Sequence, residues 1–174
     1  RWYLWAQKAP DIAGNSNLYL AEMENPWTLK GEPVMLSKPE FEWECHGFLV
    51  NEGPAVLFHE DKLFISYSAS ATDENYCMGL LWIDLDANPL APQNWHKSPE
   101  PVFKTSYENR QYGPGHNSFT QTPEGEDVLV YHARNYTEIE GDPLYDPNRH
   151  TRLKTIRWQE NGMPDFGIPA ADNQ

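Results

Sequence analysis

The sequence predicts an all-β protein of about three antiparallel sheets arranged radially, and three observations support this. Fifteen Pro and eleven Gly divide the 174 residues into short segments, which argues against long helices. Many of these segments are apolar or aromatic runs with the length of β-strands. Similar runs also recur at nearly constant spacing, because Tyr67 follows Trp5 by 62 positions and Tyr131 follows Tyr67 by 64.

This repeat is typical of a β-propeller, in which each blade is a small sheet of antiparallel strands. The spacing exceeds the usual ~40–50 residues per blade, a difference that long loops between strands would explain. A β-sandwich with accidental spacing is the alternative, since sandwiches contain the same short strands. Strands are expected at positions 2–7, 17–21, 55–58, 63–68, 77–85, 118–122, 128–133 and 152–158.

Composition excludes several classes of partner. The formal net charge is −13 and no basic cluster is present, so a nucleic-acid backbone would be repelled and nucleic acid is not expected as a partner. No apolar run approaches the ~18 residues of a membrane-spanning segment, so no membrane contact is expected. Cys45 and Cys77 are expected to be partly buried free thiols. They do not decide between a cytoplasmic, a periplasmic and a secreted location.

The first candidate site residue is Glu52, at positions 51–54 between two apolar runs. A carboxyl group held there would be partly desolvated, which favours its protonated form and suits a general acid. The alternative is a structural Glu that caps a turn where a strand starts.

The second candidate is His116, which follows two glycines around a proline, Gly113 and Gly115. These residues let the backbone turn tightly and place His116 at the mouth of the next strand. A His in that position can bind a sugar hydroxyl, a water or a metal ion. An ordinary structural hydrogen bond is the alternative.

The third candidate is Arg149, carried by a loop over positions 142–152 with two Asp-Pro steps that favour extended or turn geometry. A fixed guanidinium can donate paired hydrogen bonds to neighbouring oxygens, such as those of a sugar diol. A surface ion pair with Asp142 or Asp146 is the alternative. A fourth stretch, 68–79, is small and polar, and it either lines a shallow site or is a simple loop. The sequence contains no GxGxxG, P-loop, HExxH or GxSxG motif.

Taken together, these stretches resemble glycoside hydrolase family 43, especially its arabinofuranosidase members. The resemblance rests mainly on two motifs, NEGP at 51–54 and GPGHNSF at 113–119, in that order and at that distance. It runs through nearly all of the chain, and the further similar stretches lie at 14–19, 24–27, 67–70, 149–152 and 165–167.

The resemblance implies a five-bladed β-propeller with its active site at the central channel. Family members invert the anomeric centre with a general base Asp, an Asp that tunes and orients the acid, and a general acid Glu. Glu52 matches the acid, and Arg149 matches the Arg that reaches the sugar in the innermost subsite. His116 matches the central His, which in many relatives contacts a water or a metal ion, often calcium. No cofactor is implied as a requirement, but a structural calcium in the channel, bound to His116 through water, is compatible with the resemblance.

One departure from the family pattern is informative. No aspartate in this sequence fits the base or the tuning motif, which in the family lie upstream of anything like the aromatic strand that starts at Arg1. We therefore expect residues 1–174 to be the C-terminal part of one propeller catalytic domain, with about three blades present and the N-terminal blades missing.

The expected function is the removal of terminal arabinofuranosyl residues from plant polysaccharide by an inverting mechanism, with the fragment alone inactive. One alternative is a β-xylosidase of the same family, acting on xylose-containing oligosaccharide or polysaccharide. Another is a non-catalytic carbohydrate-binding β-domain that uses Trp and Tyr as stacking platforms.

Overall fold

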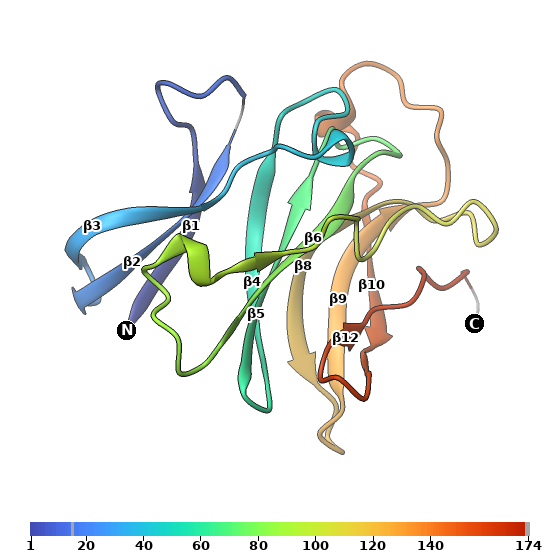
Figure 1. The fold of residues 1–174 in the computed structure, drawn as a ribbon. Coiled ribbons are helices and arrows are strands. Elements are labelled where there is room, and N and C mark those ends of the chain that lie inside the picture. The colour runs from blue at the N-terminus through green and yellow to red at the C-terminus, as the bar shows by residue number, and fades with distance from the viewer. Residues whose placement is uncertain (15, 173–174) are drawn as a thin grey trace.

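The computed structural model describes residues 1–14 and 16–172, in which three antiparallel sheets lie side by side (Figure 1). The first sheet consists of β1 (Trp2–Gln7), β2 (Asn17–Asn25) and β3 (Thr28–Ser37). The second consists of β4 (Asn51–His59), β5 (Lys62–Ala69), β6 (Cys77–Asp84) and β7 (His96–Lys97). The third is formed by β8 (Tyr112–Gln121), β9 (Asp127–Arg134) and β10 (His150–Thr155), and a small ribbon of β11 (Arg157–Trp158) and β12 (Pro164–Asp165) follows.

The expected all-β fold with about three sheets is confirmed. Helical structure in the described ranges is confined to the 3₁₀ turns η1 (Glu42–Glu44), η2 (Pro92–Asn94) and η3 (Pro143–Tyr145). None of these turns has the length or the apolar character needed to cross a membrane. The first strands of the three sheets lie next to one another, since β4 contacts both β1 and β8. This is the radial order of propeller blades rather than the two facing layers of a sandwich.

Several strand boundaries differ from those expected. β4 begins at Asn51 instead of position 55, β8 begins at Tyr112 instead of position 118, and β3 was not expected. The glycines and prolines of these stretches suggested loops, but β-bulges absorb them within paired strands. The loop expected before each strand is therefore wrong for Glu52 and His116, whereas Arg149 does lie directly before β10.

The second sheet is buried on both faces. Successive side chains of a strand point to opposite sides, so its strands contribute to two cores. Phe64 of β5 packs into a core shared with the third sheet, whereas Ile65 packs into a core shared with the first. In β6, Leu80 and Leu81 divide in the same way. Each fully buried aliphatic or aromatic side chain contributes roughly 1.5–3 kcal/mol, so the second sheet forms the rigid centre on which the site is built.

The repeat seen in the sequence corresponds to equivalent positions in the blades only in part. Tyr67 lies in β5 and Tyr131 in β9, each the second strand of its sheet, whereas Trp5 lies in β1, which pairs with β2 alone among the described strands. Trp2 and Tyr3 of β1 are accordingly about half exposed, at 48% and 49%. The first sheet is thus more open than the other two.

Candidate active site

Glu52 is placed by the irregular start of β4. It pairs with Ser68 of β5, and the register then shifts before Ala55 because of a bulge. Gly53 supplies the positive φ of 55° within this bulge. A Cβ added at Gly53 would lie 3.2 Å from the imidazole of His116. Glycine is therefore required both by the backbone conformation and by the close approach of the histidine.

The carboxylate of Glu52 forms a compact group with Tyr76 and His116, which we call the Glu52 group. The hydroxyl of Tyr76 donates a hydrogen bond of 2.6 Å to Oε1 of Glu52. Nδ1 of His116 lies 3.9 Å from the same Oε1 and 3.3 Å from the Tyr76 oxygen. An N–H on Nδ1 can thus donate to Tyr76, which in turn donates to Glu52. The Glu52 side chain keeps 34% of its surface exposed, so substrate can reach it.

The backbone of His116 is fixed by its conformation and by a hydrogen bond of its amide, in addition to the contacts of its ring. Its φ of 46° lies in the left-handed region, which non-glycine residues rarely adopt. Its amide donates a hydrogen bond of 2.7 Å to Oγ of Ser68, the residue opposite Glu52 in the sheet. Backbone strain of this kind is retained where the surrounding structure imposes it, and it is common at functional sites.

Tyr76 stays protonated and acts as a donor in the Glu52 group. Burial and the negative charge of Glu52 raise the pKa of Tyr76 well above its usual range. The ring of His132 stacks behind it, with centroids 5.6 Å apart. Burial and the positive charge of Arg149 lower the pKa of His132 to about 4, so that this ring is neutral near pH 7. Gly115 leaves space for the stack, since a Cβ there would lie 2.6 Å from the Tyr76 ring.

Arg149 lies at the same end of the third sheet as His116. Gly115, which precedes His116, pairs with His132. His132 in turn pairs with Thr151, two residues after Arg149, so His116 and Arg149 lie near the same level of the sheet. The charge of Arg149 affects the pKa values of both Tyr76 and His132. Its Nη2 donates to the carbonyl of Leu144 at 3.1 Å. The structure therefore brings Arg149 near the Glu52 group without a direct hydrogen bond to it.

The expected alternative for Arg149, an ion pair with Asp142 or Asp146, is not found among the described residues. Asp146 pairs with the buried Arg134, whose Nε lies 3.2 Å from Oδ1. Arg134 also donates to the carbonyl of Pro143 at 2.7 Å. This buried guanidinium fixes the loop that carries Arg149 and leaves the Arg149 side chain available.

A second carboxylate, Glu44, lies beneath the start of β4 in a buried polar network. Its side chain is completely buried, and each oxygen accepts hydrogen bonds. Oε1 accepts from Asn51 Nδ2 and from the Tyr67 hydroxyl, both at 2.9 Å. Oε2 accepts from Nζ of Lys97 at 2.9 Å and from the backbone amides of residues 40 and 41. Because Asn51 directly precedes Glu52, this network fixes the segment that presents the candidate acid.

Sequence reasoning missed Tyr76, Glu44 and His132 as parts of this end of the molecule. Tyr76 lies in the polar stretch 68–79, which left open whether it lined a site. A lone tyrosine among small polar residues was the only signal. Glu44 stood in a run of acidic and aromatic residues, which carries no mark of a buried network.

The residues around His116 do not make a calcium site by themselves. Calcium takes six to eight oxygen ligands, and within residues 1–14 and 16–172 no group of three or more His, Cys, Asp or Glu could hold a metal ion. His116 offers a nitrogen, with its side chain 57% exposed. A cation beside it would need further oxygen ligands such as backbone carbonyls, amides or water.

The radially arranged sheets define the chain as part of a β-propeller, and comparison with known proteins specifies which one. Residues 1–164 match glycosyl hydrolases family 43. The chain therefore belongs to this family, whose propellers have five blades, and its three sheets form part of such a propeller. The expected family and fold are both confirmed.

Several proteins that are about half identical to the chain are named arabinofuranosidases. The chain is 54% identical over 173 residues to an extracellular exo-alpha-(1->5)-L-arabinofuranosidase of Streptomyces avermitilis, and 51% identical over 174 residues to alpha-L-arabinofuranosidase 43 of Humicola insolens. Each alignment includes 99% of this chain but only 36% of the relative. The crystal structure of alpha-L-arabinofuranosidase from Lactobacillus brevis superposes with a TM-score of 0.97 at 58% identity, covering 99% of this chain and 54% of that one.

Proposed function

We propose that this chain belongs to an exo-acting α-L-arabinofuranosidase and supplies its general acid, Glu52, in an inverting mechanism. The observation that carries the proposal is the Glu52 group, in which a partly exposed carboxylate accepts a 2.6 Å hydrogen bond from a buried tyrosine. The names of the relatives support terminal arabinofuranosyl residues of polysaccharide as the substrate, rather than xylose-containing chains.

In this mechanism the protonated carboxyl of Glu52 gives its proton to the glycosidic oxygen as the bond from that oxygen to the anomeric carbon breaks. The product carboxylate is then stabilised by the Tyr76 hydroxyl, and Nδ1 of His116 lies 3.9 Å from the same oxygen. Charge-assisted hydrogen bonds of this kind are about twice as strong as neutral ones. The Tyr76 contact therefore becomes stronger as the proton leaves, which is the condition for it to accelerate the reaction.

Inversion also needs a base that activates a water on the opposite face of the sugar, with the two carboxyl groups about 6.5–9.5 Å apart. Apart from Glu52, no carboxylate of the described residues is hydrogen bonded or ion-paired to Tyr76 or His116. We assign the base to a part of the longer enzyme that this chain does not contain. The two named relatives are each nearly three times as long as the segment that aligns with this chain. Residues 1–174 alone would then be inactive.

We assign to His116 and Arg149 the binding of sugar hydroxyls at the end of the third sheet. His116 has its second ring nitrogen free of described partners, and Arg149 is held by Leu144 with further donors to spare. No metal ion is required by this scheme, and a structural calcium would contact His116 only through water.

The test uses the full-length enzyme that contains this chain and linear α-(1→5)-arabinan. We expect release of free arabinose only, and NMR spectra recorded in the first minutes should show the β-anomer before mutarotation. Release of the α-anomer would contradict an inverting mechanism, and release of xylose from xylan without arabinose from arabinan would contradict the substrate.

A further inference from the structure

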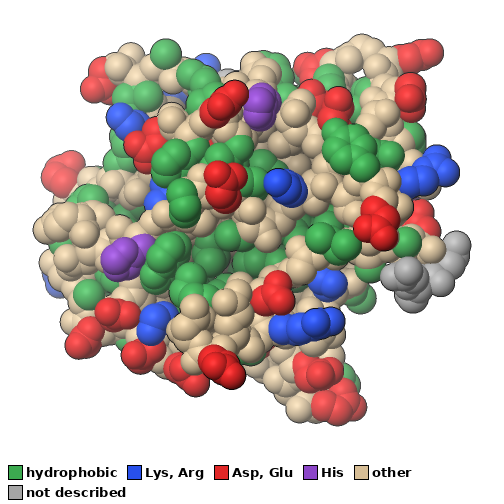
Figure 2. Space-filling model, turned by 45° about the vertical axis from the view of Figure 1, so that its right-hand side comes forward, with side chains coloured by type: hydrophobic (Ala, Val, Ile, Leu, Met, Phe, Trp, Pro, Cys, Tyr) green, Lys and Arg blue, Asp and Glu red, His purple; other side chains and the backbone are tan. Residues whose placement is uncertain are grey.

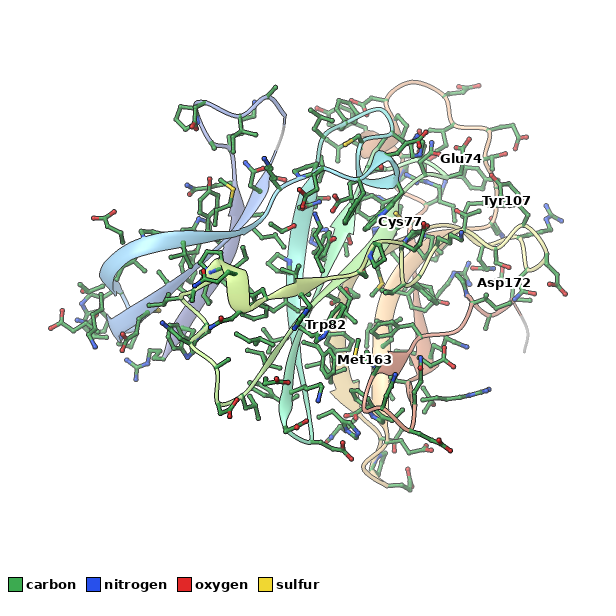
Figure 3. The ribbon with its side chains drawn as sticks, viewed as in Figure 1. Glu74, Cys77, Trp82, Tyr107, Met163 and Asp172 are labelled. Atoms are coloured by element: carbon green, nitrogen blue, oxygen red, sulfur yellow. The ribbon has the colours of Figure 1, made fainter. Side chains whose placement is uncertain are left out.

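A concave site lies beside the segment that carries Tyr76. It is a cavity of about 450 Å³, and we call it the outer pocket. Its walls come from the η1 turn, from residues 74–77 and from residues 100–107. Glu74, Cys77 and Tyr107 line it, and all three lie in the upper right part of Figure 3. Glu52, His116 and Arg149 do not line it, so it is separate from the Glu52 group.

The outer pocket and the Glu52 group share one short segment of chain. Tyr76 points to one side and donates to Glu52, whereas Glu74, Asn75 and Cys77 line the pocket on the other side. Cys77 pairs with Ala69, which pairs with Asn51, so the pocket is level with the start of β4. Both sites therefore open at the same end of the blade.

The walls of the outer pocket are fixed by hydrogen bonds. The Thr105 hydroxyl donates to the carbonyl of Glu74 at 2.6 Å and accepts from the amide of Gly113 at 2.9 Å. The indole of Trp43 donates to the carbonyl of Pro99 at 2.9 Å. Residues 102 and 103 are also bonded to Met78 of β6 by backbone hydrogen bonds. A site with its walls already in place loses little conformational entropy when a ligand binds.

The side chains around this cavity combine an aromatic surface with free polar groups. Tyr107 is 70% exposed, and its ring contacts that of Tyr112 edge to face at 5.7 Å. The side chains of Glu74, Glu100 and Lys104 have no hydrogen bond or ion pair with any described residue. Acidic side chains are spread over the face seen in Figure 2, with basic ones between them.

This combination favours a neutral, hydroxyl-rich ligand. Two carboxylates oppose an anion such as a uronate or a phosphate, and Lys104 offsets part of their attraction for a cation. A sugar ring has an apolar C–H face that packs on an aromatic ring and hydroxyls that both donate and accept hydrogen bonds. The volume lies in the range of small-molecule sites, about 300–1,000 Å³.

We propose that the outer pocket is a second carbohydrate-binding site, which holds a neutral arabinofuranosyl segment of the polymer while another chain end enters the active site. Its identity as an arabinan site rests on the proposed function. Binding there raises the local concentration of chain ends without taking part in the reaction.

The test compares Tyr107→Ala with Trp27→Ala in the full-length enzyme. Trp27 is a suitable control because its side chain is 82% exposed and lies in the turn between β2 and β3, outside the pocket. For Tyr107→Ala we expect KM on linear arabinan to rise roughly three- to tenfold, as the loss of one aromatic contact implies. Values of kcat and the rate on p-nitrophenyl α-L-arabinofuranoside, which occupies only the active site, should stay within about twofold of the wild type. Equal KM values for the two variants on arabinan would overturn the proposal.

A binding measurement separates this inference from the proposed function. Electrophoresis through gels with linear arabinan reports retention without any need for catalysis, and the Glu52→Gln background prevents digestion of the gel. Retention that is reduced by Tyr107→Ala but not by Trp27→Ala would support the pocket even if the wild type hydrolysed no arabinan. Retention unaffected by Tyr107→Ala, or retention by xylan in place of arabinan, would contradict it.

Discussion

Glu44 and Glu52 lie eight positions apart and both accept a hydrogen bond from a buried tyrosine, yet their surroundings differ. Glu44 is completely buried and accepts hydrogen bonds from five donors, including the ammonium of Lys97. Glu52 accepts one, from Tyr76, and keeps 34% of its side chain exposed. A completely buried carboxylate with every lone pair occupied has no position left at which a substrate could bind. One with a single donor and an open side can exchange a proton with a substrate.

The two tyrosines show the same contrast. Burial, followed by the charge of the neighbouring carboxylate, raises the pKa of both Tyr67 and Tyr76. Tyr67 lies inside the core between the first and second sheets, whereas Tyr76, which is equally buried, lies between the Glu52 carboxylate and the ring of His132. Similar local chemistry therefore serves architecture in one place and the proposed reaction in the other.

The largest expected effect is that of Glu52→Gln in the full-length enzyme. Hydrolysis of arabinan should fall by about 10²–10⁴-fold, the usual contribution of general acid catalysis. An aryl arabinofuranoside with a good leaving group needs little protonation and should lose far less. Steady-state assays on both substrates measure the difference. Equal losses on the two would mean that Glu52 is not the acid.

Glu44→Gln should act on stability instead. It leaves the ammonium of Lys97, which is 13% exposed, without its buried partner. Removing one member of a buried pair typically costs about 3–5 kcal/mol in the free energy of unfolding, which urea titration would measure. Glu42→Gln, an exposed neighbour in the same turn, is the control and should change little. Residual activity should fall equally on arabinan and on the aryl glycoside; a selective loss on arabinan would place Glu44 in the reaction.

The comparison also shows what the sequence could predict. NEGP and GPGHNSF marked Glu52 and His116 as candidates, and the structure shows why a glycine stands beside them, since Gly53 lies against the imidazole. Arg149 became a candidate because the Asp-Pro steps marked a loop before a strand. Glu44, by contrast, depends on contacts with Asn51, Tyr67 and Lys97, up to 53 positions away. Such contacts exist only after the sheets pack, so no local pattern reports them. For the same reason the start of β4 was placed too late, since its pairing with β5 overrides the local turn signal of glycine and proline.

The pH dependence of the free energy of unfolding should show the contribution of His132. His132 has a pKa of about 4 in the folded protein, against 6.5 for an ordinary histidine. Between these values the unfolded chain binds more protons, so stability should fall as the pH decreases from about 6.5 to 4, by up to about 3 kcal/mol. Urea titrations at pH 7 and pH 4.5 should therefore differ less for His132→Phe than for the wild type. His150→Gln, an exposed control, should keep the full dependence.

The smallest effects should come from substitutions of the two tyrosines, one acting on stability and the other on catalysis. Tyr67→Phe removes a hydrogen bond to a buried charged group and should cost about 1.5–3 kcal/mol of stability. Tyr76→Phe should lower kcat on arabinan roughly tenfold, because the Glu52 carboxylate that forms as the proton leaves loses its hydrogen-bond donor, with a smaller loss on the aryl glycoside. Thermal unfolding and kinetics of both variants would test this assignment. A kinetic loss for Tyr67→Phe that exceeded that for Tyr76→Phe would reverse it.

The space that Gly115 leaves for the Tyr76 ring links two positions 39 apart in the sequence. A Cβ at position 115 would meet the ring at 2.6 Å and Oγ of Ser68 at 2.9 Å. Alanine at position 115 would therefore be tolerated only together with a smaller residue at 76, and that residue could no longer reach Glu52. Along any evolutionary path that keeps the enzyme active, the two positions should be inherited as a pair. A library randomised at both should return active clones almost only with glycine and tyrosine together.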